Sequence, residues 1–301
     1  MINSVIYKDD KEYPKLLKQV GKEAPKQIYY KGEYNTSIFE NCLAVIGSRR
    51  LTSYGKEAAE QLVSQIASPR PAGQAGITIV SGFMYGGDAA AHQAAIKVGG
   101  RTIAVMPCGI DLIHPEHQKE LYQEILNNKG LIISEYKGEM KPALWSYPQR
   151  NRIVAGLSQA VLVLEAGEKS GTLITANYAK KFKRKIFALP GPITGSVSKG
   201  TNLLIKQGAE MVTGAKDILD YYRSMTRGRS LKNTSFAKDV FFKERPQGFE
   251  LQVFELLERE PMTIDELSRH LGISSSELGV KLSLMEMQGV IRLRGGKYYT
   301  R

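Results

Sequence analysis

Seven short apolar runs recur along the middle of the chain, and each ends in small or polar residues. They read, in order, LAVIG, GITIVSG, RTIAVMPCG, GLIISEY, AVLVLEA, KIFALPG and AEMVTG. A strand buried on both faces of a sheet has a continuous apolar run, whereas a strand with one wet face alternates with polar residues. Helical stretches separate most of the runs, so the pattern predicts an α/β fold with a doubly wound, mostly parallel sheet.

The pattern divides the chain into four segments. Residues 1–41 are weakly periodic and are expected to form a short extension that packs on the core, while residues 42–222 carry the predicted sheet. Residues 223–248 contain seven basic and two acidic residues, a composition typical of a linker. Residues 249–301 form a second, small domain.

The last segment has the pattern of a winged helix. After a first amphipathic helix, Thr263 precedes Glu266 by three residues, as in a capping box at a helix start. The letters LGIS then indicate the turn of a helix-turn-helix, and a further helix follows. Alternating residues around Gly295 and Gly296 predict a hairpin.

The charge balance points to a polyanionic partner. The 301 residues include 42 Lys and Arg against 30 Asp and Glu, a formal net charge of +12. Basic surface of this kind binds nucleic acid by releasing its counterions. The apolar runs are too short to span a bilayer, and the first residues lack the apolar core of a signal peptide. We therefore expect no membrane segment, a cytoplasmic location, and buried thiols at Cys42 and Cys108.

Loops rich in Gly, Ser and Thr follow the predicted strands. In a doubly wound sheet, ligands bind outside the carboxyl ends of the strands, where helix N-termini and backbone N–H groups attract anions. One such loop is usually a tight turn, but six of them meet at one edge here, which favours a polyanion-binding edge. They read GSRRLTSYG, SGFMYGGD, PCGID, SEY, EAGEKSGT and PGPITGSVSKGTN.

Arginines and a tyrosine near these loops suit a nucleic acid. Arg49 and Arg50 follow the first strand, and either can bind a phosphate bidentately. Arg150 and Arg152 flank an asparagine, although Arg152 could instead fix the neighbouring loop. Tyr147 either stacks on a base or packs as an ordinary aromatic residue.

Several enzyme motifs are absent. The segment around Lys169 and Ser170 does not fit a phosphate-binding P-loop, and neither a dinucleotide fingerprint nor a hydrolase elbow is present. His114 and His117 have metal-ligand spacing but no third ligand beside them, so a helix start is the better interpretation. Glu165 could act in acid–base chemistry or hold a loop by accepting N–H bonds, and we favour the second role.

The ordered set of loops resembles the DNA-processing protein A family (DprA, or Smf). The matching segments are AVIGSRR, IVSGFMYGGDAAAHQAAI, GGRTIAVMPCGID, GLIISEY, YPQRNRIVAGLSQAVLVLEAGEKSGTLITANYA and FALPGPITGSVSKGTNLLIKQGA, followed by the winged helix. The resemblance implies an extended Rossmann-like fold, a homodimer and a cytoplasmic single-stranded DNA binder that catalyses no reaction and needs no cofactor. It also implies a partner, the recombinase RecA, which such proteins load onto DNA during natural transformation and recombination.

The resemblance implies DNA-contacting residues at the matching motif positions. To these we add Ser81 and Gly82, the first two residues of the second loop. The set is Gly47, Ser48, Arg49, Arg50, Ser81, Gly82, Tyr147, Arg150, Asn151, Arg152, Ser170, Gly171, Thr172 and Lys199. The second loop departs from the family, with Met84 in place of Ala, Tyr85 where Arg is common and Gly87 in place of Ile. We expect the loop to lose one positive charge and to be looser.

Two other functions fit parts of the sequence. A nucleotide phosphoribohydrolase on the same fold would need a glutamate at the position of Thr175. A winged-helix transcription regulator would read duplex DNA through its second helix-turn-helix helix, with four residues facing the groove. Those residues are Ser275, Ser276, Lys281 and Ser283.

Overall fold

The structure is a computed structural model that describes residues 4–69, 76–227, 248–287 and 290–300. The chain forms two compact units, Met1–Leu231 and Lys232–Arg301. The predicted extension and sheet domain both fall in the first unit, and the predicted winged helix falls in the second. Most of the predicted linker, residues 228–247, lies outside the described residues.

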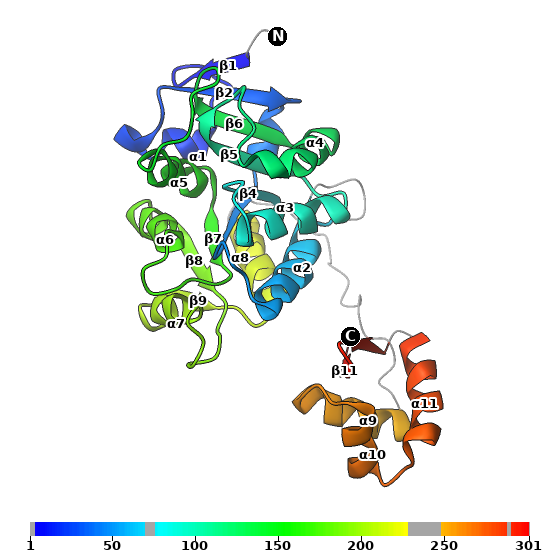
Figure 1. The fold of residues 1–301 in the computed structure, drawn as a ribbon. Coiled ribbons are helices and arrows are strands. Elements are labelled where there is room, and N and C mark those ends of the chain that lie inside the picture. Colours follow the sequence, from blue (N-terminus) through cyan, green and yellow to red (C-terminus); the bar gives the residue numbers. More distant parts are fainter. Residues whose placement is uncertain (1–3, 70–75, 228–247, 288–289, 301) are drawn as a thin grey trace. The chain divides into compact units, whose positions relative to one another are not determined.

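The first unit contains one nine-stranded sheet with the order β1-β2-β6-β5-β4-β3-β7-β8-β9 (Figure 1). In this order the seven strands from β6 to β9 run parallel to one another, which confirms the predicted α/β class. The strands are β1 (Ser4–Tyr7), β2 (Gln27–Gly32), β3 (Cys42–Ile46), β4 (Thr78–Ser81), β5 (Thr102–Gly109), β6 (Leu131–Tyr136), β7 (Ala160–Val163), β8 (Lys185–Ala188) and β9 (Glu210–Met211).

The N-terminal segment extends this sheet. Strand β1 pairs antiparallel with β2, and β2 pairs antiparallel with β6, where Tyr29 lies opposite Ser134. A short helix between them places Leu17, which is fully buried, against the core. The segment therefore adds two strands to the edge of the sheet, in addition to packing on the core.

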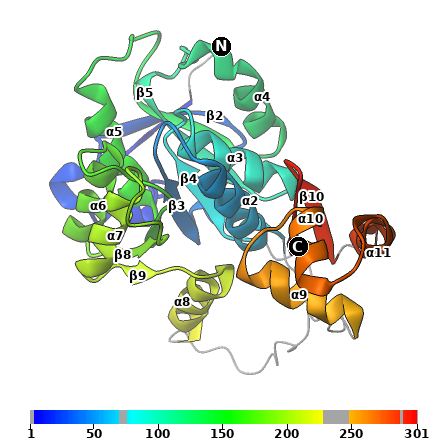
Figure 2. The same ribbon diagram turned by 60° about the horizontal axis from the view of Figure 1, so that its bottom comes forward.

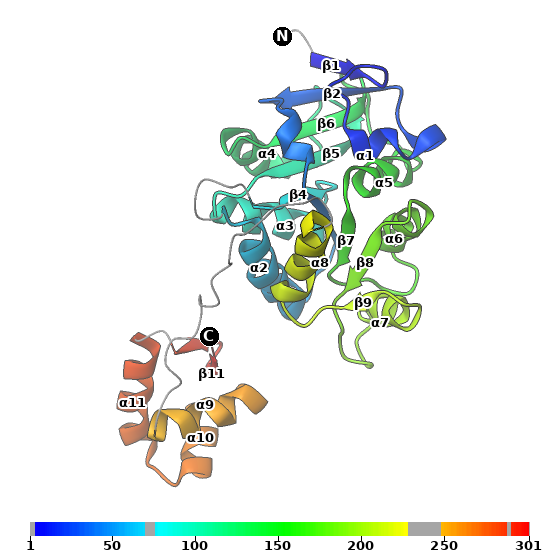
Figure 3. The same ribbon diagram turned by 180° about the vertical axis from the view of Figure 1, so that it is seen from behind.

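Helices cover both faces of the sheet, as continuous apolar strands require (Figures 1 and 3). One face carries α1 (Lys15–Lys18), α5 (Ser146–Leu157), α6 (Thr172–Lys181) and α7 (Lys199–Lys206). The other carries α2 (Ser53–Ala67), α3 (Gly87–Lys97), α4 (Lys119–Asn127) and α8 (Ala215–Arg227). Short 3₁₀ turns occur at η1 (Gly21–Glu23), η2 (Thr36–Phe39) and η4 (Glu116–Gln118).

Helix α8 continues past residue 222, where the sequence pattern places the end of the domain. Its apolar side is fixed by Ile218 and Tyr222, both buried in the core. Asp220 pairs with Lys216 and with Arg223, which supports the last turns from the outer side. None of the described residues in this stretch is a helix breaker, so the helix runs through Arg227.

The strand order reverses at β3, which is the feature that positions the site. From β3 the chain builds outward through β4, β5 and β6, and it then returns to place β7 on the other side of β3. The loops that follow β3 and β7 diverge at this point, and doubly wound sheets bind ligands in the crevice that results.

The second unit is a winged helix with its own apolar core (Figure 2). Thr263 and Glu266 form the predicted capping box, and Gly272 ends the following helix with a φ of 67°. Positive φ at Gly295 and Gly296 forms the predicted hairpin. The elements are α9 (Phe249–Arg259), α10 (Ile264–Leu271), α11 (Ser275–Met287), β10 (Ile291–Arg294) and β11 (Lys297–Thr300).

Among the helices that the structure describes, none combines the length and the apolar character needed to cross a membrane.

Candidate nucleic-acid interface

A cleft of about 720 Å³ opens at the strand reversal, beside the carboxyl ends of β3, β4 and β7. Four segments line it: the loops after β3 and β4, the first turns of α5, and the start of α6. Eleven of the fourteen residues selected from the sequence meet there. They are Gly47, Ser48, Arg49, Arg50, Gly82, Tyr147, Arg150, Asn151, Ser170, Gly171 and Thr172.

Three selected residues do not line the cleft. The Ser81 side chain is buried and donates to the carbonyl of Val45 at 2.6 Å. Lys199 is the exposed first residue of α7. Arg152 points away from the cleft, and its contacts define a separate buried cluster.

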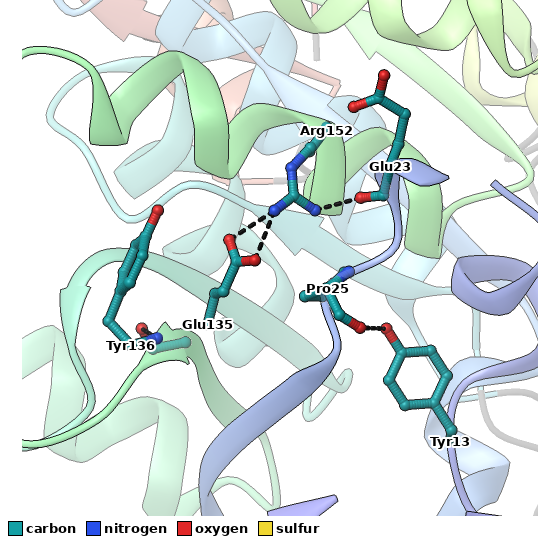
Figure 4. Close-up of polar contacts among 7 residues, drawn as sticks. Tyr13, Glu23, Pro25, Glu135, Tyr136 and Arg152 are labelled. Atoms are coloured by element: carbon teal, nitrogen blue, oxygen red, sulfur yellow. Dashed lines mark hydrogen bonds and ion pairs between the residues drawn. The ribbon is translucent and has the colours of Figure 1, made fainter. Parts of the chain in front are cut away.

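Arg152 ties three segments of the fold together (Figure 4). Its Nη2 lies 2.6 Å from both carboxylate oxygens of Glu135, at the end of β6, and its Nη1 donates to the carbonyl of Glu23. Beside it, the Tyr13 hydroxyl donates to the carbonyl of Pro25 at 2.8 Å. The Arg152 side chain is only 5% exposed, so the structure supports the loop-fixing role.

Arg150 forms the floor of the cleft. Its Nη1 donates to the carbonyls of Gly82 and Val105, and its Nε donates to Asn151 Oδ1 at 3.2 Å. Burial lowers the pKa of Arg150, and the nearby Asp88 carboxylate raises it. Most of the guanidinium is thus already bonded, so Arg150 shapes the cleft more than it presents a free charge.

The absence of a side chain at Gly82 leaves space for the Arg150 guanidinium. A Cβ at Gly82 would lie 2.5 Å from Arg150 Nη2 and 2.6 Å from Asp88 Oδ2. Burial raises the pKa of the Asp88 carboxyl, and Arg150 offsets part of that rise. Gly82, which directly follows β4, therefore leaves space for the side chains of Arg150 and Asp88, in addition to any anion-binding role of its N–H group.

Glu165 occupies the N-terminus of α2. The Thr52 N–H donates to Glu165 Oε2 at 3.0 Å, the Thr52 hydroxyl donates to the other carboxylate oxygen, and Thr52 Oγ1 accepts from Gly55 N at 3.1 Å. The prediction that Glu165 holds a loop is confirmed. A carboxylate already neutralises this helix terminus, so a phosphate near Arg50 would have to rely on the arginines and not on α2.

The first two loops pack backbone against backbone. Gly87 N donates to the carbonyl of Ser48 at 3.0 Å, and a Cβ at Gly87 would lie 2.4 Å from the Cα of Gly47. Gly86 adopts a φ of 67°, and Met84 is buried. The second loop is therefore held closely against the first, so the expected loosening is not what the structure shows.

The free positive charge of the cleft comes from Arg49 and Arg50. Both are exposed, and neither forms an ion pair with another described residue. Arg49 Cζ lies 5.4 Å from the ring centroid of Tyr147, a cation–π distance. The Tyr147 hydroxyl lies 2.8 Å from His114 Nε2, which holds the ring in place.

His114 and His117 belong to the segment that leads into α4, as the helix-start interpretation predicts. Partial burial lowers the pKa of His114, and the charges of His117 and Arg49 lower it further. The part of the chain that the structure describes brings no three His, Cys, Asp or Glu side chains together in a group that could hold a metal ion. Asp111 forms an ion pair with Lys31 at 2.9 Å.

The cleft also contains residues that sequence reasoning did not select as contacts. Asp88 could have been found, because it closes the second Gly-rich loop. Leu144 carries no such signal, since it lies in an irregular segment and its side chain is 92% exposed. The additional lining residues are Ile46, Met84, Asp88, Leu144, Pro148, Val154, Ile174 and Thr175.

Known proteins of similar sequence carry the names Smf and DNA processing protein DprA. Protein Smf of Synechocystis is 32% identical over 97% of this chain and 79% of its own length. Protein Smf of Escherichia coli is 39% identical over 65% of this chain and 50% of its own length. The DNA processing protein DprA of Streptococcus pneumoniae is 39% identical over 65% of this chain and 67% of its own length.

Two solved structures share the fold. DprA of Streptococcus pneumoniae superposes with a TM-score of 0.67 and 36% identity, over 73% of this chain and 74% of that one. DprA of Helicobacter pylori superposes with a TM-score of 0.64 and 31% identity, over 75% of this chain and 97% of that one. The Helicobacter structure is described as giving a single-stranded DNA binding mode.

The family profiles cover both units of the chain. The DNA recombination-mediator protein A profile matches residues 4–223, and the DprA winged-helix profile matches residues 244–297. With the cleft at the strand reversal and the C-terminal winged helix, these matches confirm the resemblance seen in the sequence. The chain belongs to the DprA family of DNA recombination-mediator proteins.

Proposed function

We propose that the cleft binds single-stranded DNA without sequence preference. The observation that carries this proposal is the pair of exposed arginines, Arg49 and Arg50, which face a cleft of about 720 Å³ beside the ring of Tyr147. Proteins that bind single strands combine positive charge along the backbone path with aromatic faces on which bases stack. The net charge of +12 and the single-strand binding described for the Helicobacter relative support the same conclusion.

Each part of the cleft has a separate role in this proposal. Arg49 and Arg50 bind phosphates, and Gly171, the N-cap of α6, offers a backbone N–H group at a positive helix end. Tyr147 stacks on a base. Arg150 and Arg152, which the sequence motif also presented as contacts, act mainly by holding α5 in place.

In the cell, we propose a non-enzymatic role in recombination. The protein would act as a cytoplasmic homodimer, without a cofactor, that protects incoming DNA and loads RecA onto it during natural transformation or recombination. Membership in a family of recombination mediators and the DNA-processing names of the relatives support this role.

The two rival functions have weaker support. A phosphoribohydrolase needs a carboxylate where the cleft has Thr175, and the carboxylate that does line the cleft, Asp88, lies against Arg150. For a transcription regulator, α11 is poorly charged: Lys281 pairs with Glu277 at 3.4 Å and lies over Phe249. Val280 and Leu284 are large apolar residues exposed on α11, which suits a protein contact better than a DNA groove.

Fluorescence anisotropy with labelled oligo-dT and a matched duplex, across a salt series, tests the proposal. We expect the single strand to bind far more tightly, with log K falling steeply with log salt. Arg50→Ala should flatten that slope by about 0.7, the share of one phosphate. Lys97→Ala, an exposed lysine of α3 that does not line the cleft, is the control and should leave the slope unchanged.

Equal or tighter binding of the duplex, with no effect of Arg50→Ala, would contradict the proposal. The DNA site would then lie outside the cleft, and the winged helix would be the next place to search.

A further inference from the structure

An exposed pair of stacked rings lies next to the cleft but does not line it. The Tyr85 and His117 rings have centroids 4.8 Å apart and planes inclined by 13°. Tyr85 is 42% exposed, and His117 is exposed as well. A parallel stack of this kind packs the rings on one side and leaves ring surface on the other side open to solvent.

We propose that the Tyr85–His117 pair is a second base-stacking platform, which extends the path of single-stranded DNA beyond the cleft. The inference rests on the proposed function, because it assigns a further contact to the same ligand. Ring faces of this type stack any base, because every base has a π-face.

Both halves of the platform are continuous with the cleft wall. Tyr85 directly follows Met84, which lines the cleft. His117 shares a short segment with His114, whose Nε2 lies 2.8 Å from the hydroxyl of Tyr147 inside the cleft. The His114 and Tyr147 rings also meet edge to face, with centroids 6.2 Å apart. The aromatic surface therefore runs from Tyr147 through the histidine segment to Tyr85.

The platform is held in place before any ligand arrives. Gln118 is buried, and its Nε2 donates to the carbonyl of Phe83 at 3.0 Å, which joins the histidine segment to the second loop. Gly87 N donates to Ser48, which joins the second loop to the first. A prearranged stacking surface loses little conformational entropy on binding, so more of the stacking energy appears as affinity.

Stacking and charge have different salt signatures, and this difference defines the test. A phosphate contact adds about 0.7 to the salt slope, whereas a stacking contact leaves the slope unchanged. Tyr85→Ala removes the Tyr85 ring from the stack, Tyr85→Trp puts a larger ring in its place, and Tyr85→Arg replaces the ring by a positive charge. Tyr7→Ala is the control, because Tyr7 is a similarly exposed tyrosine, at 53%, on the edge strand β1.

Each variant is titrated with oligo-dT of increasing length and with strands of equal length that lack bases. We expect Tyr85→Ala to weaken oligo-dT binding by at least about fivefold. This loss should appear only above a threshold length, with no change in the salt slope or in the binding of the abasic strand. Tyr85→Trp should retain the affinity, and Tyr85→Arg should steepen the salt slope by about 0.7.

The inference is overturned if Tyr85→Ala matches Tyr7→Ala on every strand, which would leave the rings to another partner such as a protein. Equal weakening of oligo-dT and the abasic strand would also overturn it, since the residue would then act through loop structure. Failure of the proposed function looks different: the wild-type protein itself would show no preference for single strands and no response to Arg50→Ala.

Discussion

Arg152 and Glu135 form a two-pronged ion pair, with Arg152 Nη2 2.6 Å from each carboxylate oxygen. The pair joins α5 to the end of β6, and the Arg152 guanidinium is largely buried. Removing one partner of such a pair leaves the other charge without compensation, which typically costs about 3–5 kcal/mol. We expect the lower end of that range, because the Glu135 side chain is 22% exposed.

A double-mutant cycle with Arg152→Ala and Glu135→Ala tests this expectation by chemical denaturation. The double variant should lose clearly less unfolding free energy than the sum of the two single variants, because the second substitution removes a charge that is already unpaired. Additive losses would show that the two side chains stabilise the fold independently.

The arginines of the site should separate into DNA contacts and structural residues. Arg50→Ala should flatten the salt slope of oligo-dT binding by about one phosphate's share while leaving the melting temperature near that of the wild type. Arg152→Lys should lower the melting temperature and leave the slope unchanged, because its guanidinium is bonded to Glu135 and Glu23. A flattened slope for Arg152→Lys would return Arg152 to the DNA-contacting set.

Gly82 and Gly171 both lie in the cleft but should respond differently to an added methyl group. A Cβ at Gly82 would lie 2.5 Å from Arg150 Nη2, whereas a Cβ at Gly171 would meet nothing within 4 Å. Gly82→Ala should therefore cost about 1–3 kcal/mol, the usual range for overpacking. Gly171→Ala should be neutral or slightly stabilising in the absence of DNA. Equal melting temperatures of the two variants would contradict the packing argument.

His92 should make the fold sensitive to acid. It is fully buried, and burial lowers its pKa to about 3, with the charge of Arg150 acting in the same direction. The Thr102 hydroxyl donates to Ile79 and lies 2.7 Å from His92 Nδ1, so it accepts from that nitrogen. Among the described residues, His92 Nε2 has no hydrogen-bond partner, and a proton there would be buried without one.

The sign of the pH effect follows from this lowered pKa. Below the ordinary histidine pKa of about 6.5, the unfolded chain takes up a proton that the folded protein refuses. The unfolding free energy should therefore fall by about 1.4 kcal/mol per pH unit from this group alone, between about pH 6 and pH 4. For His92→Gln, the unfolding free energy measured by denaturation over that interval should change less steeply with pH, by the share of one proton. An unchanged slope of unfolding free energy against pH would contradict the assignment.

The sequence predicted the fold class, the winged helix and most of the cleft. Continuous apolar strands fit a sheet that is covered by helices on both faces. Strand β5 is an example, because all eight of its residues are buried. Strand ends and helix starts meet at one edge of a parallel sheet, and for this reason eleven of the fourteen residues that the family resemblance and the second loop indicated line one cleft. Local patterns also sufficed for the capping box at Thr263 and the hairpin at Gly295.

Tertiary structure alone decided which polar groups are free to bind. Arg50 and Arg152 look equivalent in the sequence, but Arg152 meets Glu135 and the Glu23 carbonyl, which the order of residues along the chain does not place beside it. The Tyr85–His117 stack likewise joins residues from two different loops. Periodicity reports which side of an element is buried, because burial repeats with the geometry of the strand or helix. The bonding partner of a single charged side chain depends on contacts between distant segments, and these exist only once the chain has folded.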